Sequence, residues 1–192
     1  ILKRDPYATV VLLPSDHHVD DEETLLESVQ AAAAVVKARP DRIVLLGISP
    51  ERAETTYGWI QPRSTGGATH PVERFVEKPD ALAADELLQS GAVWNSFVTV
   101  ASAKTLLLSY VEALPEILEP FLRELVVKPS VDGVDLLYET LPARDFSRDL
   151  LASVPDRLEV LVVPPCGWTD RGTPERLREF LETHGNLAAL SA

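Results

Sequence analysis

Several residue types are scarce or absent in this chain of 192 residues. It has one cysteine, Cys166, and no methionine, and 6% of its residues are aromatic. A lone cysteine has no disulfide partner within the chain, so we expect a reducing, cytoplasmic compartment. No stretch approaches the roughly 20 apolar residues that cross a bilayer, so we expect no membrane-spanning segment.

Positive charge is also scarce. Lys and Arg number 18 against 30 Asp and Glu, which gives a formal net charge of −12. Nucleic-acid binding needs clustered positive charge, so we expect no nucleic-acid partner. The hydrophobic share of 45% is sufficient for a core, and no repeat or long linker divides the chain. We expect one domain over residues 1–192 and leave the oligomeric state open, with a homodimer as one option.

The start of the chain adds a further expectation. The chain begins at Ile1 and contains no Met. Translation starts with Met, and its removal requires a small second residue, which Ile is not. We therefore expect a segment of a longer polypeptide; the alternative is that modified methionines are left out of the printed sequence.

The hydrophobic pattern predicts an α/β fold. Continuous apolar runs at 8–14 and 42–48 predict strands buried on both faces. The other predicted strands are 57–61, 72–77, 92–101 and 158–163, of which the first two are candidates for a hairpin. The predicted helices are 22–39, 80–89 and 173–182. A further helical stretch at 102–149 is broken at Pro115, Pro120, Pro129 and Pro142. Alternating strands and helices favour a Rossmann-like mixed, mostly parallel sheet flanked by helices.

Two aspartates follow predicted strands. Asp16 comes after ATVVLLPS, and Asp170 comes after LEVLVVPPCGWT. If these strands are neighbours and run the same way, both carboxylates lie at the ligand-binding edge of the sheet and suit Mg²⁺. The alternative is that each aspartate caps a turn or the following helix.

Other polar or small residues near strands could bind a ligand. Glu77 and Lys78 end the segment FVEKP, where a lysine can meet a phosphate and a carboxylate can accept from sugar hydroxyls. Asn95 interrupts an apolar strand, and its amide suits a pair of hydroxyls. Gly58 permits close approach to the backbone. The alternatives are a surface ion pair, a structural amide and a β-bulge, respectively.

The paired histidines are a weaker indication of function, and the common nucleotide-binding motifs are absent. His17 and His18 make a DHH sequence with Asp16, which also occurs in manganese-dependent phosphoesterases, but the companion aspartates and histidines of that family are absent. The sequence has no paired-cysteine or His-x-x-x-His spacing, no G-x-x-x-x-G-K-[ST] and no G-x-G-x-x-G. Zinc, Walker-type and dinucleotide sites are not expected, and nothing nearby supports Cys166 as a nucleophile.

Five ordered motifs resemble a known family. PSDHHV, ETTYGWI, RFVEKP, SGAVWNSF and GWTDRGTPERL resemble the sugar nucleotidyltransferases, most closely the mannose-1-phosphate guanylyltransferases. The resemblance implies a nucleotide-diphospho-sugar transferase fold and transfer of GMP from GTP to mannose 1-phosphate, with release of pyrophosphate. It also implies that GTP and a sugar 1-phosphate are the partners and that Mg²⁺ is the cofactor.

The resemblance also implies roles for individual residues. Asp16 and Asp170 match the aspartates that hold Mg²⁺, and Lys78 matches the lysine that binds the sugar 1-phosphate. Contacts to the sugar would come from three further positions: Glu77, Gly58 and Asn95. Glu54, in the segment before Tyr57, is a weaker candidate.

The sequence departs from the family pattern in several places. The glycine-rich loop G-G-x-G-T-R-L-x-P, which cradles the nucleotide, is missing, so we expect only the sugar-phosphate and metal-binding half of the catalytic domain. Phe97 stands where many relatives have Gly in WNSG, and Thr56 stands where PETGYG has Gly. The alternatives are a non-catalytic homologue that binds a sugar nucleotide, a DHH-type phosphoesterase, and a structural or interaction domain whose motif matches are coincidental.

Overall fold

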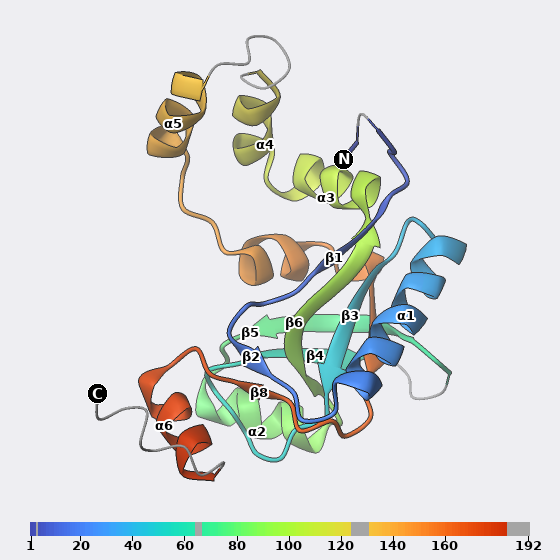
Figure 1. Cartoon of the computed structure of the whole chain (residues 1–192), viewed down its shortest axis with the longest axis vertical. Coiled ribbons are helices and arrows are strands. Elements are labelled where there is room, and N and C mark those ends of the chain that lie inside the picture. Colours follow the sequence, from blue (N-terminus) through green and yellow to red (C-terminus); the bar gives the residue numbers. More distant parts are fainter. Residues whose placement is uncertain (3, 64–66, 124–130, 184–192) are drawn as a thin grey trace.

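The computed structural model describes residues 1–2, 4–63, 67–123 and 131–183. A twisted six-stranded sheet forms its centre (Figure 1), in the order β1-β6-β3-β7-β5-β4, with an additional pairing of β6 and β4. The strands are β1 (Thr9–Leu12), β3 (Ile43–Ile48), β4 (Gly58–Pro62), β5 (His70–Glu77), β6 (Val93–Ser102) and β7 (Leu158–Val162). Two short strands, β2 (His17–His18) and β8 (Thr169–Asp170), form a separate antiparallel pair.

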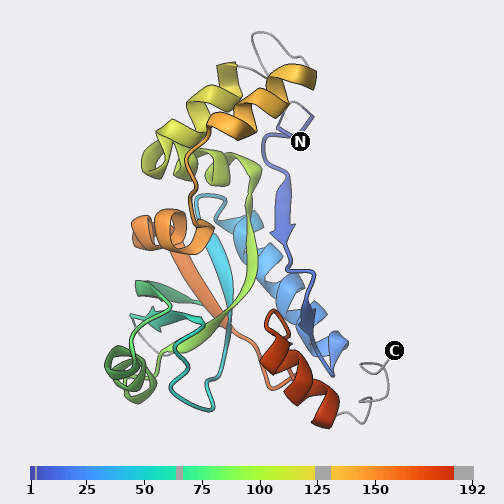
Figure 2. The ribbon, with the colours of Figure 1, turned by 90° about the vertical axis from the view of Figure 1, so that its left-hand side faces the viewer.

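Helices cover the sheet and both of its ends. They are α1 (Glu22–Ala38), α2 (Ala81–Gln89), α3 (Ala103–Ala113), α4 (Pro115–Leu122), α5 (Val131–Thr140) and α6 (Pro174–Thr183), with a π-helical turn at Phe146–Leu150 and 3₁₀ turns at Leu151–Ser153 and Pro155–Arg157. Helices α3, α4 and α5 gather at one end of the molecule, and β2, β8 and α6 lie at the other (Figures 1 and 2). None of the helices in these residue ranges has the length and apolar character of a membrane span.

The core follows the two-residue period of the strands. In β3, Val44 and Leu46 pack with Val36 of α1 on one face of the sheet. Ile43 and Leu45 point to the other face, where the segment after the π-helical turn covers them. Figure 2 shows α1 and this segment on opposite sides of β3. Both faces of the central strand are therefore buried, as predicted for this run.

The α/β class with a mixed sheet is confirmed, but the expectation of a mostly parallel sheet is wrong. Within the described residues β3 and β7 form the parallel pair, whereas β6 runs antiparallel to β1, β3 and β4, and β5 runs antiparallel to β4 and β7. A buried apolar run reveals that a strand has two covered faces. It does not reveal which strand lies beside it or in which direction that neighbour runs.

The first predicted strand exists, but its predicted burial on both faces is wrong. In the described residues β1 pairs with β6 alone, so it lies at an edge of the sheet. Val11 and Leu12 keep 36% and 37% of their surface exposed. The apolar composition was correct evidence for a strand, but it does not determine whether that strand is central or at an edge.

The other predicted elements are confirmed to within a few residues. The two middle strands do form a hairpin, because Trp59 faces Val76 and Gln61 faces Arg74 in an antiparallel register. One predicted helix break is wrong: Pro120 lies inside α4. Pro129 lies outside the described residues.

Candidate functional site

The pairing of β2 with β8 brings the two predicted metal-binding aspartates together. His17 is opposite Asp170 in this small ladder, and the backbone N–H of Arg171 donates to the carbonyl of Asp16 at 3.3 Å. The carboxylates therefore converge, as expected, but not because their strands are neighbours. Strands β1 and β7 are separated by β6 and β3, and the loops beyond them make the contact.

Gly172 leaves a small space that both carboxylates face. A Cβ atom at position 172 would lie 2.9 Å from Asp170 Oδ1 and 3.0 Å from Asp16 Oδ2. Two carboxylate oxygens around one space suit a hard divalent cation such as Mg²⁺, which commonly uses one or two carboxylates and completes its shell with water and phosphate oxygens. No group of three or more His, Cys, Asp or Glu side chains suited to a metal occurs in the described ranges. The two carboxylates fit a divalent cation whose remaining ligands come from outside this pair.

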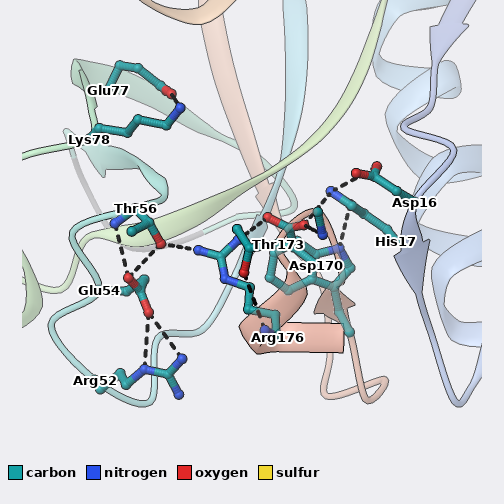
Figure 3. Close-up of polar contacts among 12 residues, drawn as sticks. Asp16, His17, Arg52, Glu54, Thr56, Glu77, Lys78, Asp170, Thr173 and Arg176 are labelled. Carbon is teal, nitrogen blue, oxygen red and sulfur yellow. Dashed lines mark hydrogen bonds and ion pairs between the residues drawn. The ribbon is translucent and has the colours of Figure 1, made fainter. Parts of the chain in front are cut away.

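Arg176 is a neighbour of this pair that the sequence motifs did not single out. Its guanidinium donates to Asp170 Oδ2 at 2.5 Å and to the Thr56 hydroxyl, and it lies 4.2 Å from the centre of the Tyr57 ring. Figure 3 shows this arginine between Thr56 and Asp170. In addition to Lys78, it is a second cationic side chain that lines the cavity with the predicted metal-binding residues. Its position in GWTDRGTPERL was the available signal.

His17 lies beside both aspartates. Its Nε2 atom is 4.0 Å from Asp16 Oδ1 and 3.9 Å from Asp170 Oδ1. Its other ring nitrogen, Nδ1, accepts from the indole N–H of Trp168 at 3.2 Å. Burial lowers the pKa of the His17 imidazole below its usual value, and this outweighs the two aspartates, which favour the protonated ring.

A second group of predicted residues lies around Gly58. A Cβ atom at this position would be 2.6 Å from Glu77 Oε2 and 3.4 Å from Asn95 Cβ, so glycine leaves room for the Glu77 carboxylate. Glu77 Oε2 is buried without a hydrogen-bond partner in the described part of the chain. Burial raises the pKa of this carboxyl above its usual value, and the Asp145 carboxylate adds to the effect. A buried acceptor without a partner is suited to a ligand hydroxyl.

Lys78 and Asn95 adjoin this carboxylate. The Lys78 Nζ atom lies 3.9 Å from Glu77 Oε1, and its side chain is about half exposed, so it is accessible to an anion. Asn95 is buried, and its Oδ1 accepts from the backbone N–H of Phe97 at 3.2 Å. The amide therefore has a structural contact, which was one of the two interpretations, and it also lines the cavity described next.

One cavity of about 610 Å³ joins the two groups. All six site residues predicted from the sequence line it: Asp16, Gly58, Glu77, Lys78, Asn95 and Asp170. His17, Phe97 and Arg176 line it as well. This volume is in the range of small-molecule sites. It combines three carboxylates with two cations, which suits a polar ligand that carries both hydroxyls and phosphate.

Glu54, the weaker candidate, and Cys166 both have structural contacts or burial that the sequence did not reveal. Glu54 accepts from the backbone N–H and the hydroxyl of Thr56, at 3.0 and 2.7 Å, and from Arg52, so it shapes the loop before Tyr57. Cys166 is buried, and burial raises the pKa of its thiol. A buried thiol with a raised pKa is a poor nucleophile, in line with the absence of local support for that role.

Comparisons with known proteins place the chain in a family. A family model described as "Nucleotidyl transferase" matches residues 1–185. The Xanthan biosynthesis protein XanB of Xanthomonas campestris pv. campestris (strain B100) is 34% identical over 191 residues, which cover 92% of this chain and 38% of that protein. A mannose-1-phosphate guanylyltransferase of Sinorhizobium fredii is 30% identical over 177 residues, which cover 86% of this chain and 33% of that protein. The chain thus spans less than half the length of these relatives.

Solved structures show the same fold. A Thermus thermophilus structure described as a mannose-1-phosphate geranyltransferase superposes with a TM-score of 0.78 and 28% identity, over 88% of this chain and 48% of that chain. A Helicobacter pylori structure described as a mannose-6-phosphate isomerase gives a TM-score of 0.73 at 20% identity, over 88% of this chain and 66% of that chain. The second match supports the fold alone.

Proposed function

Since the chain belongs to the nucleotidyl transferase family, we propose that it carries the sugar-phosphate and cation site of a mannose-1-phosphate guanylyltransferase. In that reaction an oxygen of mannose 1-phosphate attacks the α-phosphorus of GTP, and pyrophosphate leaves with the electrons of the broken P–O bond. The observation that carries the proposal is that one cavity gathers all six predicted site residues. The name of a relative at 30% identity, mannose-1-phosphate guanylyltransferase, supports mannose 1-phosphate and a guanylyl donor as the particular substrates.

The proposed mechanism depends on positioning and charge. Nucleotidyl transfer requires little covalent chemistry from the protein, because alignment and charge stabilisation provide most of the acceleration. Asp16 and Asp170 would hold Mg²⁺, which supplies neutralisation of the phosphate charge when bound. Lys78 holds the phosphate of the sugar, and Glu77 accepts hydrogen bonds from sugar hydroxyls through its buried Oε2.

The first test is pyrophosphate release from GTP and mannose 1-phosphate by an intact enzyme that joins this chain to a nucleotide-binding loop. Asp170→Asn is expected to lower turnover by about 100-fold or more, the scale of losing one charge-stabilising group. Lys78→Ala is expected to act chiefly on the apparent KM for mannose 1-phosphate. Normal turnover in Asp170→Asn would contradict the cation assignment, and an unchanged KM in Lys78→Ala would contradict the phosphate assignment.

Binding separates the proposal from a non-catalytic homologue. Mannose 1-phosphate titrated into this chain with Mg²⁺ should bind, and Glu77→Gln should weaken binding by roughly tenfold, equivalent to about 1.4 kcal/mol. Glu73→Gln, an exposed change on the same strand, is the matched control. Binding without any pyrophosphate release by the intact enzyme would favour the non-catalytic homologue.

A further inference from the structure

The two ring nitrogens of His17 face different chemical groups. Nε2 faces the carboxylates of Asp16 and Asp170 at 4.0 and 3.9 Å. Nδ1 faces the opposite way, toward the indole N–H of Trp168 at 3.2 Å. Figure 3 shows the ring directly beside both aspartates. The side chain is 14% exposed, so the protein rather than bulk water sets its hydrogen bonds.

The contact with Trp168 determines where the proton of the ring lies. An indole nitrogen can only donate a hydrogen bond, so Nδ1 must present its lone pair. A ring with a free lone pair on Nδ1 is neutral and carries its proton on Nε2. The N–H group therefore faces the two carboxylates, and the lone pair of the ring faces Trp168.

Trp168 is itself held in place. Its ring meets His17 edge to face, with centroids 5.1 Å apart and planes at 86°, and it meets Tyr57 at 5.5 Å and 67°. It also packs against two of the buried clusters. The indole cannot turn its N–H away from Nδ1 without disturbing these contacts, so the tautomer is fixed by packing.

We propose that His17 is a positioning residue of the cation site: its Nε2–H is directed at Asp16 and Asp170, and Trp168 fixes that tautomer, so the imidazole is not a metal ligand. This inference rests on the proposed function in one respect, that the two aspartates hold the cation. Histidines that bind a metal ordinarily donate from their other nitrogen to a carboxylate or carbonyl. In this chain Nδ1, the nitrogen that would have to donate, instead accepts a hydrogen bond from Trp168.

Two consequences follow for the site. An N–H beside two carboxylates offsets their mutual repulsion and helps to keep them around the space at Gly172. The site also offers carboxylate oxygens and no imidazole lone pair. Such a donor set suits Mg²⁺ and Mn²⁺, whereas Zn²⁺ gains most from an imidazole or thiolate ligand.

The tautomer can be observed directly by NMR. In the metal-free chain labelled with ¹⁵N-histidine, the ¹⁵N shifts and two-bond couplings of His17 identify the protonated nitrogen. We expect Nε2–H in the wild-type chain and a mixture of tautomers in Trp168→Phe, which keeps an aromatic ring but removes the donor. A wild-type ring protonated on Nδ1 would overturn the inference.

Matched variants at position 17 test the effect on the cation. Gln can place its amide N–H near the position of Nε2, whereas the shorter Asn side chain reaches only the position of Nδ1, where its oxygen can accept from Trp168. By calorimetry with Mn²⁺ alone, His17→Gln should bind within about twofold of wild type and His17→Asn about tenfold more weakly, a loss typical of groups that orient metal ligands. Equal Mn²⁺ affinity in wild type and in His17→Asn would contradict the positioning role.

Zinc provides the complementary measurement. Trp168→Phe removes the donor to Nδ1, so the ring can carry its proton on Nδ1 and present a lone pair on Nε2. The Zn²⁺ affinity of this variant should therefore rise by about tenfold, while its Mn²⁺ affinity changes little. Circular dichroism verifies that the variant is folded; if it is not, the His17 variants and the NMR measurement still decide. A loss of Zn²⁺ binding in His17→Gln would show that the imidazole is a ligand and would overturn the inference.

These tests separate two kinds of failure. If the chain binds neither Mn²⁺ nor mannose 1-phosphate, the proposed function fails, but the NMR measurement still reports whether Trp168 fixes the His17 tautomer. If the cation binds and the tautomer is Nδ1–H, the function stands and this inference fails.

Discussion

At the scale of single residues, two residues that line the cavity have backbone φ angles that most side chains avoid. Lys78 has φ = 48° and Phe97 has φ = 65°, both in the left-handed region, and both residues line the cavity. A side chain in this region costs about 1–2 kcal/mol relative to the right-handed one. Phe97 keeps 43% of its surface exposed and packs partly against Phe146. The strain is concentrated where a ligand would bind, which is common at functional sites.

This strain leads to an unusual order of stabilities at position 97. Phe97→Gly relieves the backbone, whereas Phe97→Ala loses the ring and keeps the strain. We expect the Gly variant to be more stable than the Ala variant by about 1 kcal/mol, although Ala is ordinarily the more stable of the two. Urea unfolding measures the difference. If Ala proves the more stable residue, the positive φ at this position is wrong.

Glu77 predicts a dependence of stability on pH. Its pKa is raised in the folded protein, so above the ordinary Glu value of 4.5 the folded state binds more protons than the unfolded state. Folding therefore loses stability as rising pH ionises the buried carboxyl. Glu77→Gln lacks this loss, so its unfolding free energy should rise relative to wild type as the pH increases from below 4.5.

Urea unfolding at a series of pH values tests this expectation. Glu73→Gln, on the same strand but exposed, should stay within about 0.5 kcal/mol of wild type at every pH. A constant difference between wild type and Glu77→Gln across the pH series would contradict the raised pKa.

At the scale of elements, a buried carboxylate ties the sheet to the end of α1. Glu159 of β7 is 2% exposed. Arg39, just after α1, contacts both of its oxygens, and the Thr69 hydroxyl donates to Oε2 at 2.6 Å. Arg42 Nε lies 3.8 Å from Oε1. These contacts neutralise the charge on a strand that is covered on both faces.

Removing one partner should expose the cost of burying this charge. Arg39→Ala is expected to destabilise the chain by about 2–4 kcal/mol, because Glu159 would remain buried with weaker compensation. Adding Glu159→Leu to that variant should recover most of the loss, since a leucine has no charge to bury. Arg144→Ala, which breaks an exposed pair with Glu116, should change stability little. No recovery in the double variant would contradict this account.

At the scale of the whole molecule, the negative charge of the chain favours the proposed divalent cation. The chain carries a formal charge of −12, and the cavity contains three carboxylates, those of Asp16, Glu77 and Asp170. A doubly charged sugar phosphate is repelled by this field unless cations offset it. Lys78 and Arg176 supply two, but Arg176 is already paired with Asp170. A divalent cation would therefore complete the charge balance of the site.

This balance predicts that the two ligands stabilise the protein together. At a 100-fold excess over its Kd, a ligand stabilises the folded state by about 2.7 kcal/mol, which raises the melting temperature by roughly 5–10 °C at this chain length. We expect such a rise with mannose 1-phosphate and Mg²⁺ together, and little rise with mannose 1-phosphate alone. Differential scanning fluorimetry provides the measurement, with Lys78→Ala as the control. A full shift without any divalent cation would contradict the role given to the metal.

The sequence by itself determined the local elements and most of the residues of the candidate site. The helix over α1 and the hairpin of β4 and β5 follow from periodicities that extend over only a few residues, so neighbouring positions carry all the information. Asp16, Glu77, Lys78 and Asp170 were identified by motifs, because chemistry at a site requires particular residue types in short, ordered segments.

Only the tertiary structure decided which segments meet. The antiparallel place of β6 between β1 and β3, the edge position of β1, and the contact of Arg176 with Thr56 across 120 residues all depend on how distant segments pack. The Trp168–His17 hydrogen bond spans 151 residues. Local sequence preferences contain no information on such pairs, because their energies arise only when the folded chain brings the partners into contact. The fold therefore decided the tautomer of His17, the partner of Asp170 and the shape of the cavity.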